Sequence, residues 1–527
     1  SSLNSRIQAS GFGLIRLAEG ASAFYASLSI QSPSVLGFVI ISWRTYLSLS
    51  ANVPALLEEY ASHKAKPAAA SKVKKQSGNK AVPLEAIIAM LESTIGTGVD
   101  SDAPLMEAGL DSLGAVELGN HLQAASGQTL PSTLIFEYPT ARQLAKYFES
   151  TTSPDAPQEA PVLPKAPAPA RELRMNPLLC GTSVKLPANI RTSRDFGKMV
   201  SCGGDLTSEV PFDRWAVDTP SYSKGIIGQR ARHGAFLRGA ELFDNIFFNV
   251  SPVEAGSMDP QQRLLLEYGY ESLRCALKAT GTLLDSLTGV FLGIANNDFA
   301  EIVRSDPSLS RNVYSATGST QSVAAGRLSF VLDLQGPCIS VDTACSAALA
   351  ANHYALRSLQ VRECFAALSI GVSMMLLPGV AFSFATAGML SALGHCHTFD
   401  SRADGYVRGE ACCGATLIAR GFHDVIDAPE LMGSCVRQDG KSASLTAPNG
   451  QAQRSLLADA LSSASILPGA VAVLEAHGTG TQLGDPIEAR SVAALLAGRS
   501  DVEAASLCSV KANAGHAEPA AGLSGNR

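Results

Sequence analysis

Two segments without apolar periodicity divide the chain and rule out a single compact domain. Residues 62–81 read SHKAKPAAASKVKKQSGNKA, and residues 151–172 read TTSPDAPQEAPVLPKAPAPARE. Stretches rich in Pro, Ala and Lys form extended linkers, because they bury too little apolar surface to fold. With 527 residues, of which 46% are hydrophobic, the chain is long enough for several domains. We therefore place linkers at 62–81 and 151–174 and folded units at 1–61, 82–150 and 175–527.

The charges are unevenly distributed between these parts. Residues 1–80 contain nine Lys or Arg against three Asp or Glu, whereas residues 81–150 contain two against nine. An acidic unit behind a basic lead-in favours docking onto basic protein surfaces. The lysines from Lys64 to Lys80 are compatible with nucleic-acid contact, but charge runs of this kind are usually solvated linkers. We therefore expect no nucleic-acid partner.

Cysteine usage and hydropathy indicate the compartment. Eleven cysteines lie scattered without a CxxC pair, and no signal-peptide pattern follows Ser1. We expect reduced thiols in the cytoplasm or another reducing compartment, and no secretion. Val35–Trp43 is too short to cross a bilayer, and Gly371 and Pro378 interrupt Cys364–Phe382. We predict a buried strand plus loop at Cys364–Phe382, and no membrane span.

Residues 83–149 have helical patterning, and Ser112 begins one helix after the loop DSDAPLMEAG. The free N–H groups at such a position favour Ser as a helix cap. From these residues alone, the stronger interpretation is that Ser112 only caps the helix. A phosphodiester attached there would also be stabilised by the helix end.

A resemblance decides between the two interpretations. PLMEAGLDSLGAVELGNHL and LPSTLIFEYPTARQLAKYF closely resemble the acyl carrier domain of type I polyketide synthases over residues 82–150. The resemblance implies an all-α four-helix domain, with 4'-phosphopantetheine attached covalently to Ser112 by a phosphopantetheinyl transferase. Gly119 departs from the family, which usually has Arg there.

The segment VDTACSAALAANHYALRSL places Cys345 between a strand and an apolar-periodic helix. A helix start stabilises a thiolate and so favours a nucleophile, although a small buried core thiol is the more common case. His477 lies in LEAHGTGTQLGDPIEAR, and Lys511 and His516 lie in SVKANAGHAEPAAG. Each His follows a strand-like run, so the three segments form a candidate site.

These segments resemble the Cys-His-His signatures of polyketide ketosynthases over residues 175–527. VPFDRWAVD, FDNIFFNVSPVEAGSMDPQQRLLLE, GRLSFVLDLQGP, FDSRADGYVRGE and LTAPNGQAQ carry the same resemblance. It implies an α/β thiolase-type fold of αβαβα layers, a homodimer, and chain elongation by decarboxylative Claisen condensation of acyl and malonyl-type thioesters. Acyltransferase and other synthase domains are the implied partners.

The resemblance also implies a role for each site residue. Cys345 would take the acyl chain, and His477 and His516 would stabilise the enolate. Lys511 would polarise or orient that site, and Thr479 and Thr481 would touch the pantetheine arm. The sequence departs from the family pattern at three residues near these segments. Ala347 and Ala348 replace a pair of Ser residues, and Pro519 lies where the family begins a helix.

The family continues beyond the point equivalent to Arg527, so we expect an incomplete ketosynthase domain. The alternative is a non-catalytic carrier and docking segment with an inactive ketosynthase. A degradative thiolase-like enzyme is disfavoured by the fused carrier. Residues 1–61 resemble the C-terminal end of a polyketide ketoreductase without its catalytic Tyr or nucleotide-binding glycines, so we expect no reductase activity and no nicotinamide.

Two further motifs only partly resemble known binding sites, one a P-loop and the other a zinc site. DGKS at Asp439–Ser442 lacks the first glycine of a P-loop, because position 435 is Cys435. The cluster His395-Cys396-His397 with Cys412-Cys413 has tighter spacing than zinc ligands normally show, and it lies within the ketosynthase resemblance. We expect no metal site.

Overall fold

The structure is a computed structural model. It describes the strands β1 (Phe12–Gly13) and β2 (Ile40–Ile41) and residues 82–152, 176–217, 219, 225–280, 286–421, 428–497 and 505–525, apart from 96, 97, 107, 111, 129 and 132. β1 pairs antiparallel with β2, which lies inside the strand predicted for VLGFVIISW. The other residues of the predicted ketoreductase-like unit lie outside the described residues. So do both predicted linkers, apart from residues 151 and 152, which end a helix.

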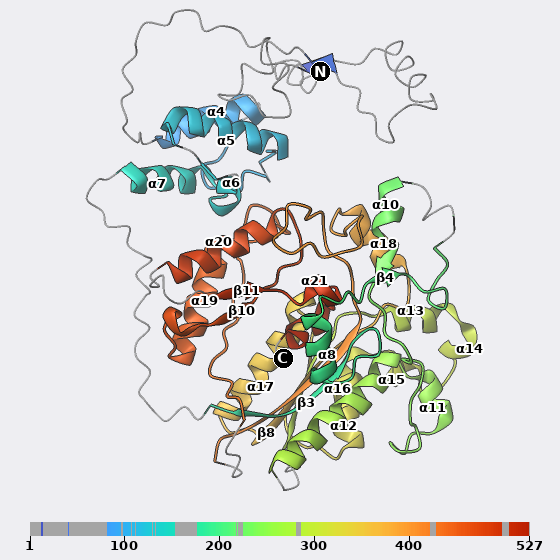
Figure 1. Ribbon diagram of the computed structural model, residues 1–527. Helices are drawn as coiled ribbons and strands as arrows, with labels where there is room; N and C mark the ends of the chain where they lie inside the picture. Colours follow the sequence, from blue (N-terminus) through green and yellow to red (C-terminus); the bar gives the residue numbers. More distant parts are fainter. Residues whose placement is uncertain are drawn as a thin grey trace, which may run out of the picture. The chain divides into compact units, whose positions relative to one another are not determined.

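The acidic unit consists of helices that enclose one apolar core (Figure 1). Its helices are α4 (Leu84–Ile95), α5 (Ser112–Ser126), α6 (Leu134–Glu137) and α7 (Ala141–Thr152). The three longer helices each bury a pair of side chains four residues apart, which lie on one face of a helix. These fully buried pairs are Ile87 with Leu91, Leu118 with Leu122, and Leu144 with Phe148.

The third unit is built on a mixed five-stranded sheet. Its strand order is β3-β9-β8-β6-β7. β9 runs antiparallel to both β3 and β8, whereas β6 runs parallel to both β8 and β7. The bounds are β3 Leu178–Lys185, β6 Gly289–Gly293, β7 Cys338–Val341, β8 Ala366–Ser373 and β9 Ala411–Ile418.

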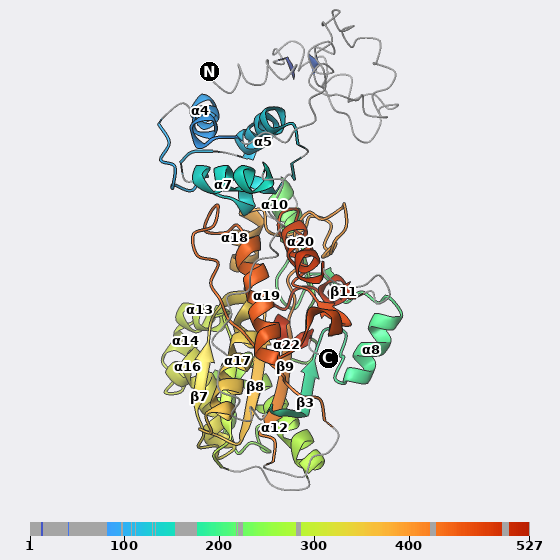
Figure 2. The same ribbon diagram turned by 90° about the vertical axis from the view of Figure 1, so that its left-hand side faces the viewer.

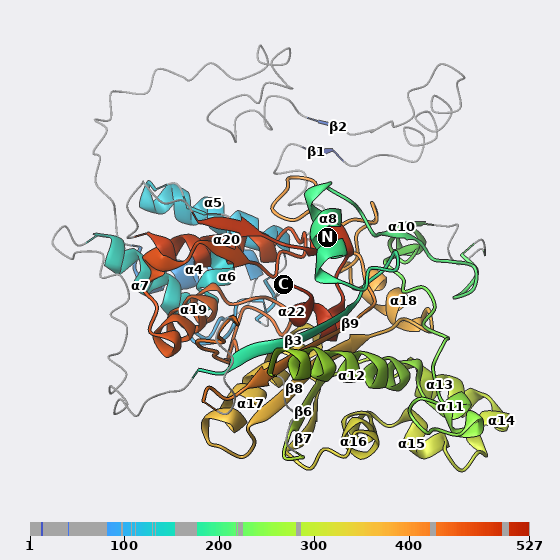
Figure 3. The same ribbon diagram turned by 60° about the horizontal axis from the view of Figure 1, so that its bottom comes forward.

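Helices cover both faces of this sheet, which explains why its inner strands are apolar on both sides. α12 (Pro260–Thr280) packs along one face and α17 (Ala347–Gln360) along the other (Figures 2 and 3). Successive side chains alternate between the two layers: Leu368 and Ile370 join the α12 cluster, whereas Phe291 and Ala367 join the α17 cluster. The predicted α/β body is therefore confirmed.

A second, smaller sheet pairs β10 (Val473–Glu475) in parallel with β11 (Ser506–Cys508). α19 (Gly450–Ala464) and α20 (Gly484–Leu496) pack on one another beside it. The remaining strands are β4 Ser208–Glu209 and β5 His233–Gly234. The remaining helices are α8 Ser193–Ser201, α10 Gly225–Arg230, α11 Pro252–Ser257, α13 Asp298–Ser305, α14 Pro307–Ser310, α15 Ser315–Ser319, α16 Gln321–Val331, η2 Ala344–Ser346, α18 Gly379–Thr386, η3 Pro468–Ala470, α21 Lys511–Ala514, η4 Glu518–Ala520 and α22 Ala521–Ser524.

The apolar stretch Cys364–Phe382 contains the buried strand β8, a loop, and the start of α18, so the predicted strand and loop are confirmed. Within the described ranges, no helix has both the length and the apolar character that crossing a membrane requires. The eleven cysteines all fall in these ranges, and every one is a free thiol.

Two glycines, one within α5 and one directly after it, test how glycine affects the stability of this helix. Gly119 lies within the helix, and no atom lies within 4 Å of the place a Cβ would occupy, whereas Gly127 follows the helix with a φ of +72°. We expect Gly119→Ala to stabilise α5 by about 1 kcal/mol and Gly127→Ala to destabilise it by about the same amount. Hydrogen–deuterium exchange of the α5 amides in the 527-residue chain measures both, and equal effects of the two substitutions would contradict this account.

Candidate active site

Cys345 lies in η2, the turn that joins the end of β7 to the start of α17. The preceding residue, Ala344, has a left-handed φ of +52°, which turns the chain sharply just before Cys345. Ala347 and Ala348 are fully buried against the sheet. A Cβ on Gly293 would lie 2.5 Å from the backbone nitrogen of Ala348, so only glycine permits this approach. The small residues after Cys345 are therefore a packing requirement.

His477 follows β10, and two carboxylates of α20 hold the loop that it begins. Glu488 accepts hydrogen bonds from the backbone N–H of His477 at 2.6 Å and of Gly478 at 2.8 Å. Asp485 accepts from the N–H of Gly480 at 3.1 Å and of Thr481 at 3.3 Å. Neither carboxylate was predicted from the sequence. Both lie in the segment GDPIE near the start of a helix, where negative charge is stabilised, and this position is the signal that could have identified them.

His516 lies between α21 and η4 and is buried, with 3% of its surface exposed. Its backbone N–H donates to Val407 O, and its carbonyl accepts from Gly409 N–H, both at 2.8 Å. Lys511 is buried nearby, and its Nζ donates to the carbonyl of Ala476 at 3.3 Å. Lys511 therefore contacts the segment that carries His477.

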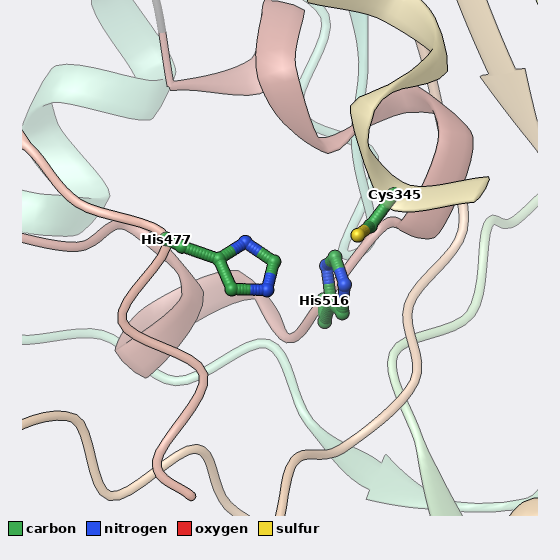
Figure 4. Close-up of side chains that lie close together, drawn as sticks. All are labelled: Cys345, His477 and His516. Carbon is green, nitrogen blue, oxygen red and sulfur yellow. The ribbon is translucent and has the colours of Figure 1, made fainter. Parts of the chain in front are cut away.

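The structure brings the three predicted side chains together. One ligand-type atom from each of Cys345, His477 and His516 lies within 4.8 Å of the others. The two imidazole rings are 5.3 Å apart between centroids and nearly perpendicular, at 88°. The Cys345 sulfur and the His477 ring both point toward His516 (Figure 4).

The surroundings of both imidazoles lower their pKa values, so both rings are neutral near pH 7. Desolvation lowers the pKa of His516 well below the ordinary histidine value, and the positive charges of Lys511 and Arg408 lower it further. His477 is exposed to solvent on one side, so desolvation is weaker there, but this effect and the charge of Lys511 also lower its pKa. Neutral imidazoles act as hydrogen-bond donors without a net charge.

The expectation that the helix start favours the Cys345 thiolate is wrong for the resting site. Desolvation raises the pKa of Cys345 above the ordinary cysteine value, and the nearby Glu518 carboxylate also raises it. A backbone hydrogen bond and the charge of Lys511 lower the pKa, but burial dominates. The thiol therefore rests protonated and must lose its proton when it reacts.

The two threonines lie differently in the loop after His477. Thr479 is buried, with 5% of its surface exposed. Thr481 accepts a hydrogen bond from Gly484 N–H at 3.2 Å and lines a pocket of about 460 Å³ with Phe399, Asp400 and Gln482. Pro519 lies in η4, and α22 begins after it, at Ala521.

The cysteines weighed as zinc ligands have other surroundings. Cys412 and Cys413 lie in the buried strand β9, and the Cys396 sulfur accepts a hydrogen bond from Val407 N–H at 3.3 Å. Burial raises the pKa of Cys396 to about 12, so its thiol stays protonated. Among the described residues, the triad of Cys345, His477 and His516 is the one group with ligand-like spacing.

Comparisons with known proteins agree with this site. Residues 178–421 match the family Beta-ketoacyl synthase, N-terminal domain, and residues 429–526 match Beta-ketoacyl synthase, C-terminal domain. Residues 85–148 match the family Phosphopantetheine attachment site, which indicates a covalently attached 4'-phosphopantetheine. The two synthase matches together span nearly two thirds of the chain.

Similar proteins include Polyketide synthase GfsB of Streptomyces halstedii, which is 40% identical over 81% of this chain and 8% of that protein. Spectinabilin polyketide synthase system protein NorA' of Streptomyces orinoci is 36% identical over 99% of this chain and 15% of that protein. A solved ketosynthase from module 6 of the bacillaene synthase of Bacillus subtilis 168 is 32% identical. Its TM-score is 0.60, and the match covers 66% of this chain and 60% of that one.

The chain spans only 6 to 23% of the length of the first polyketide synthases that it matches. Within that span, the nucleophile turn and the two imidazole loops fall inside the synthase matches, and α4 to α7 overlap the attachment-site match. The chain therefore belongs to the type I modular polyketide synthases and carries a phosphopantetheine-binding domain and a ketosynthase domain.

Proposed function

We propose that the chain extends a polyketide by decarboxylative Claisen condensation at Cys345. The thiol attacks the carbonyl of an acyl thioester, its proton leaves with the pantetheine thiol, and an acyl-Cys345 thioester forms. A malonyl-type thioester then loses carbon dioxide, and its enolate carbon attacks the acyl carbonyl with expulsion of the Cys345 thiolate, which then takes a proton from the solvent. The observation that carries this proposal is the convergence of Cys345, His477 and His516 from three separate segments.

The two imidazoles suit the decarboxylation step. Negative charge develops on the thioester oxygen when carbon dioxide leaves, and fixed hydrogen-bond donors stabilise it. Both rings are held at their backbones, His477 by Glu488 and His516 by residues 407 and 409, so the donors are positioned before the reaction. Lys511 supports the His477 loop through the Ala476 carbonyl, and Thr479 and Thr481 are assigned to the pantetheine arm.

In this proposal the substrate reaches the site on a phosphopantetheine arm attached to Ser112 of a four-helix carrier. The match to the attachment-site family and the start of α5 at Ser112 support this position. A phosphopantetheinyl transferase would supply the arm from coenzyme A, and acyltransferase and other synthase domains would load and process the chain. We also assign residues 1–61 to the end of a ketoreductase-like domain. For the ketosynthase we propose the thiolase-type fold, which has five layers in the order αβαβα.

Ser112→Ala tests the carrier assignment. Incubation with coenzyme A and a phosphopantetheinyl transferase should add one arm to the wild-type chain and none to the variant, because only this hydroxyl is the acceptor. Intact-mass spectrometry reads the result, and Ser126→Ala, at the other end of α5, is the control that should still be modified. An arm that persists on Ser112→Ala would contradict the assignment.

His477→Ala and His516→Ala test the roles of the imidazoles. Loss of one oxyanion donor costs on the order of a hundredfold in rate, so both variants should lose release of carbon dioxide from a malonyl thioester. Acylation of Cys345, followed by peptide mass mapping, should change much less. The alternative interpretation, a non-catalytic docking segment, predicts no carbon dioxide release by the wild-type chain.

The ketosynthase is also proposed to form a homodimer through the β7 edge of its sheet. β7 is the last strand in the sheet order, and large apolar side chains are exposed beside it, with Phe330 of α16 87% and Ile339 39% exposed. Exposed strand edges and apolar patches are covered in stable proteins, here by a second copy.

Phe330→Glu should weaken this dimer at least tenfold, because a buried charge replaces a large aromatic contact. Leu467→Glu is the control, since Leu467 is 78% exposed but precedes η3, away from the β7 edge. Sedimentation velocity over a range of concentrations measures both variants. A wild-type chain that stays monomeric at all concentrations would contradict the proposed dimer.

A further inference from the structure

A buried ion pair lies beside the catalytic triad and has no role in the mechanism above. Arg408 donates from Nε to Glu518 Oε1 at 2.6 Å and from Nη2 to Oε2 at 2.9 Å. The Arg408 side chain is 1% exposed and that of Glu518 is 10% exposed. Two parallel hydrogen bonds between a guanidinium and a carboxylate fix the orientation of both groups, which a single contact does not.

Both members of the ion pair lie next to residues that hold His516. The residues on either side of Arg408 bind the His516 backbone, through Val407 O and Gly409 N–H. Glu518, two residues after His516, then returns to the Arg408 side chain. Glu518 has a left-handed φ of +44°, an unfavourable conformation for a residue with a side chain, which persists only where other contacts hold it.

The same carboxylate also connects to the sheet and the nucleophile turn. The Asn296 amide, which follows β6, donates to Glu518 Oε2 at 3.5 Å and to Ser373 Oγ at 3.2 Å, at the end of β8. η4, which begins with Glu518, packs against η2, the turn that contains Cys345. The Glu518 side chain therefore joins the His516 segment to the sheet, and the element that it begins packs against the Cys345 turn.

We propose that Arg408 and Glu518 are positioning residues that hold the His516 imidazole at a fixed place relative to the Cys345 sulfur and balance the charges around that sulfur. This inference rests on the proposed function of the triad. The charged or titratable groups that face Cys345 are Lys511, Glu518, His477, His516 and Tyr406. Glu518 is the one carboxylate among them, so its loss removes a negative charge that faces the thiol and leaves Arg408 without its bidentate partner.

Glu518→Gln separates charge from shape, because Gln has the same length and still accepts one hydrogen bond from Arg408. With the carboxylate charge removed, the pKa of Cys345 should fall. In the 527-residue chain, the midpoint of the pH profile for Cys345 alkylation by iodoacetamide, followed by peptide mass mapping, should therefore move to lower pH. Carbon dioxide release from a malonyl pantetheine thioester should slow about tenfold or more, with little change in KM, because a displaced imidazole no longer meets the reacting oxygen.

Two further variants keep the test decisive. Glu518→Asp retains the charge on a shorter stem, so the alkylation midpoint should stay near the wild-type value while carbon dioxide release remains slow. Glu410→Gln is the matched control. Glu410 is a fully buried carboxylate of the same segment that binds Arg214 at 3.0 Å and the backbone N–H groups of Leu237 and Met375, and not the His516 loop. It should lower the melting temperature without moving the alkylation midpoint.

The outcomes distinguish this inference from the proposed function. If Glu518→Gln lowers only the melting temperature, as the control does, and leaves both the midpoint and carbon dioxide release unchanged, the pair is merely structural and the inference is overturned. If Glu518→Gln does not fold, a wild-type rate of carbon dioxide release in Glu518→Asp overturns it equally. If His516→Ala itself releases carbon dioxide at the wild-type rate, the proposed function fails instead, whatever the Glu518 variants do.

Discussion

The position of Cys345 depends on one close contact between backbones. The first turn of α17 lies directly on β6 and β8 because Gly293 and Gly371 leave no side chains between them. At this separation Ala347 and Ala348 fill the remaining space, and larger side chains would force the helix away from the sheet. Cys345 is therefore located by rigid main chain and not by a flexible rotamer, which is the kind of support that a reacting atom requires.

Carboxylates provide the second level of support, and two of them act on the His477 loop in the same way. Glu488 and Asp485 of α20 each accept hydrogen bonds from backbone N–H groups of this loop. Burial of an anion is costly unless several donors surround it, so each carboxylate stabilises only the loop conformation that presents those donors. The glycines of the His477 loop leave its backbone flexible in the unfolded chain, and the α20 carboxylates then select one conformation.

Much of this arrangement could be predicted from the sequence, because it follows from local patterns. The apolar spacing located the carrier helices, and the strand-like runs before His477 and His516 located both imidazoles. The contact between Arg408 and Glu518, 110 residues apart, could not be predicted, because tertiary packing alone brings these segments together. The contact between Glu488 and the His477 backbone spans only 11 residues, but it depends on how the loop between them folds back onto α20. The error on the Cys345 pKa has the same cause, since its burial depends on distant segments.

The separation of the triad along the chain has a consequence for biosynthesis. Cys345 and His516 are 171 positions apart. The thiol belongs to the β7–α17 turn, whereas His477 follows β10 and His516 lies between α21 and η4. At typical elongation rates a ribosome needs roughly 10 to 30 s to make that stretch. During this interval the Cys345 thiol has been made but His516 has not. The proposed site is therefore complete only after the His516 segment has docked.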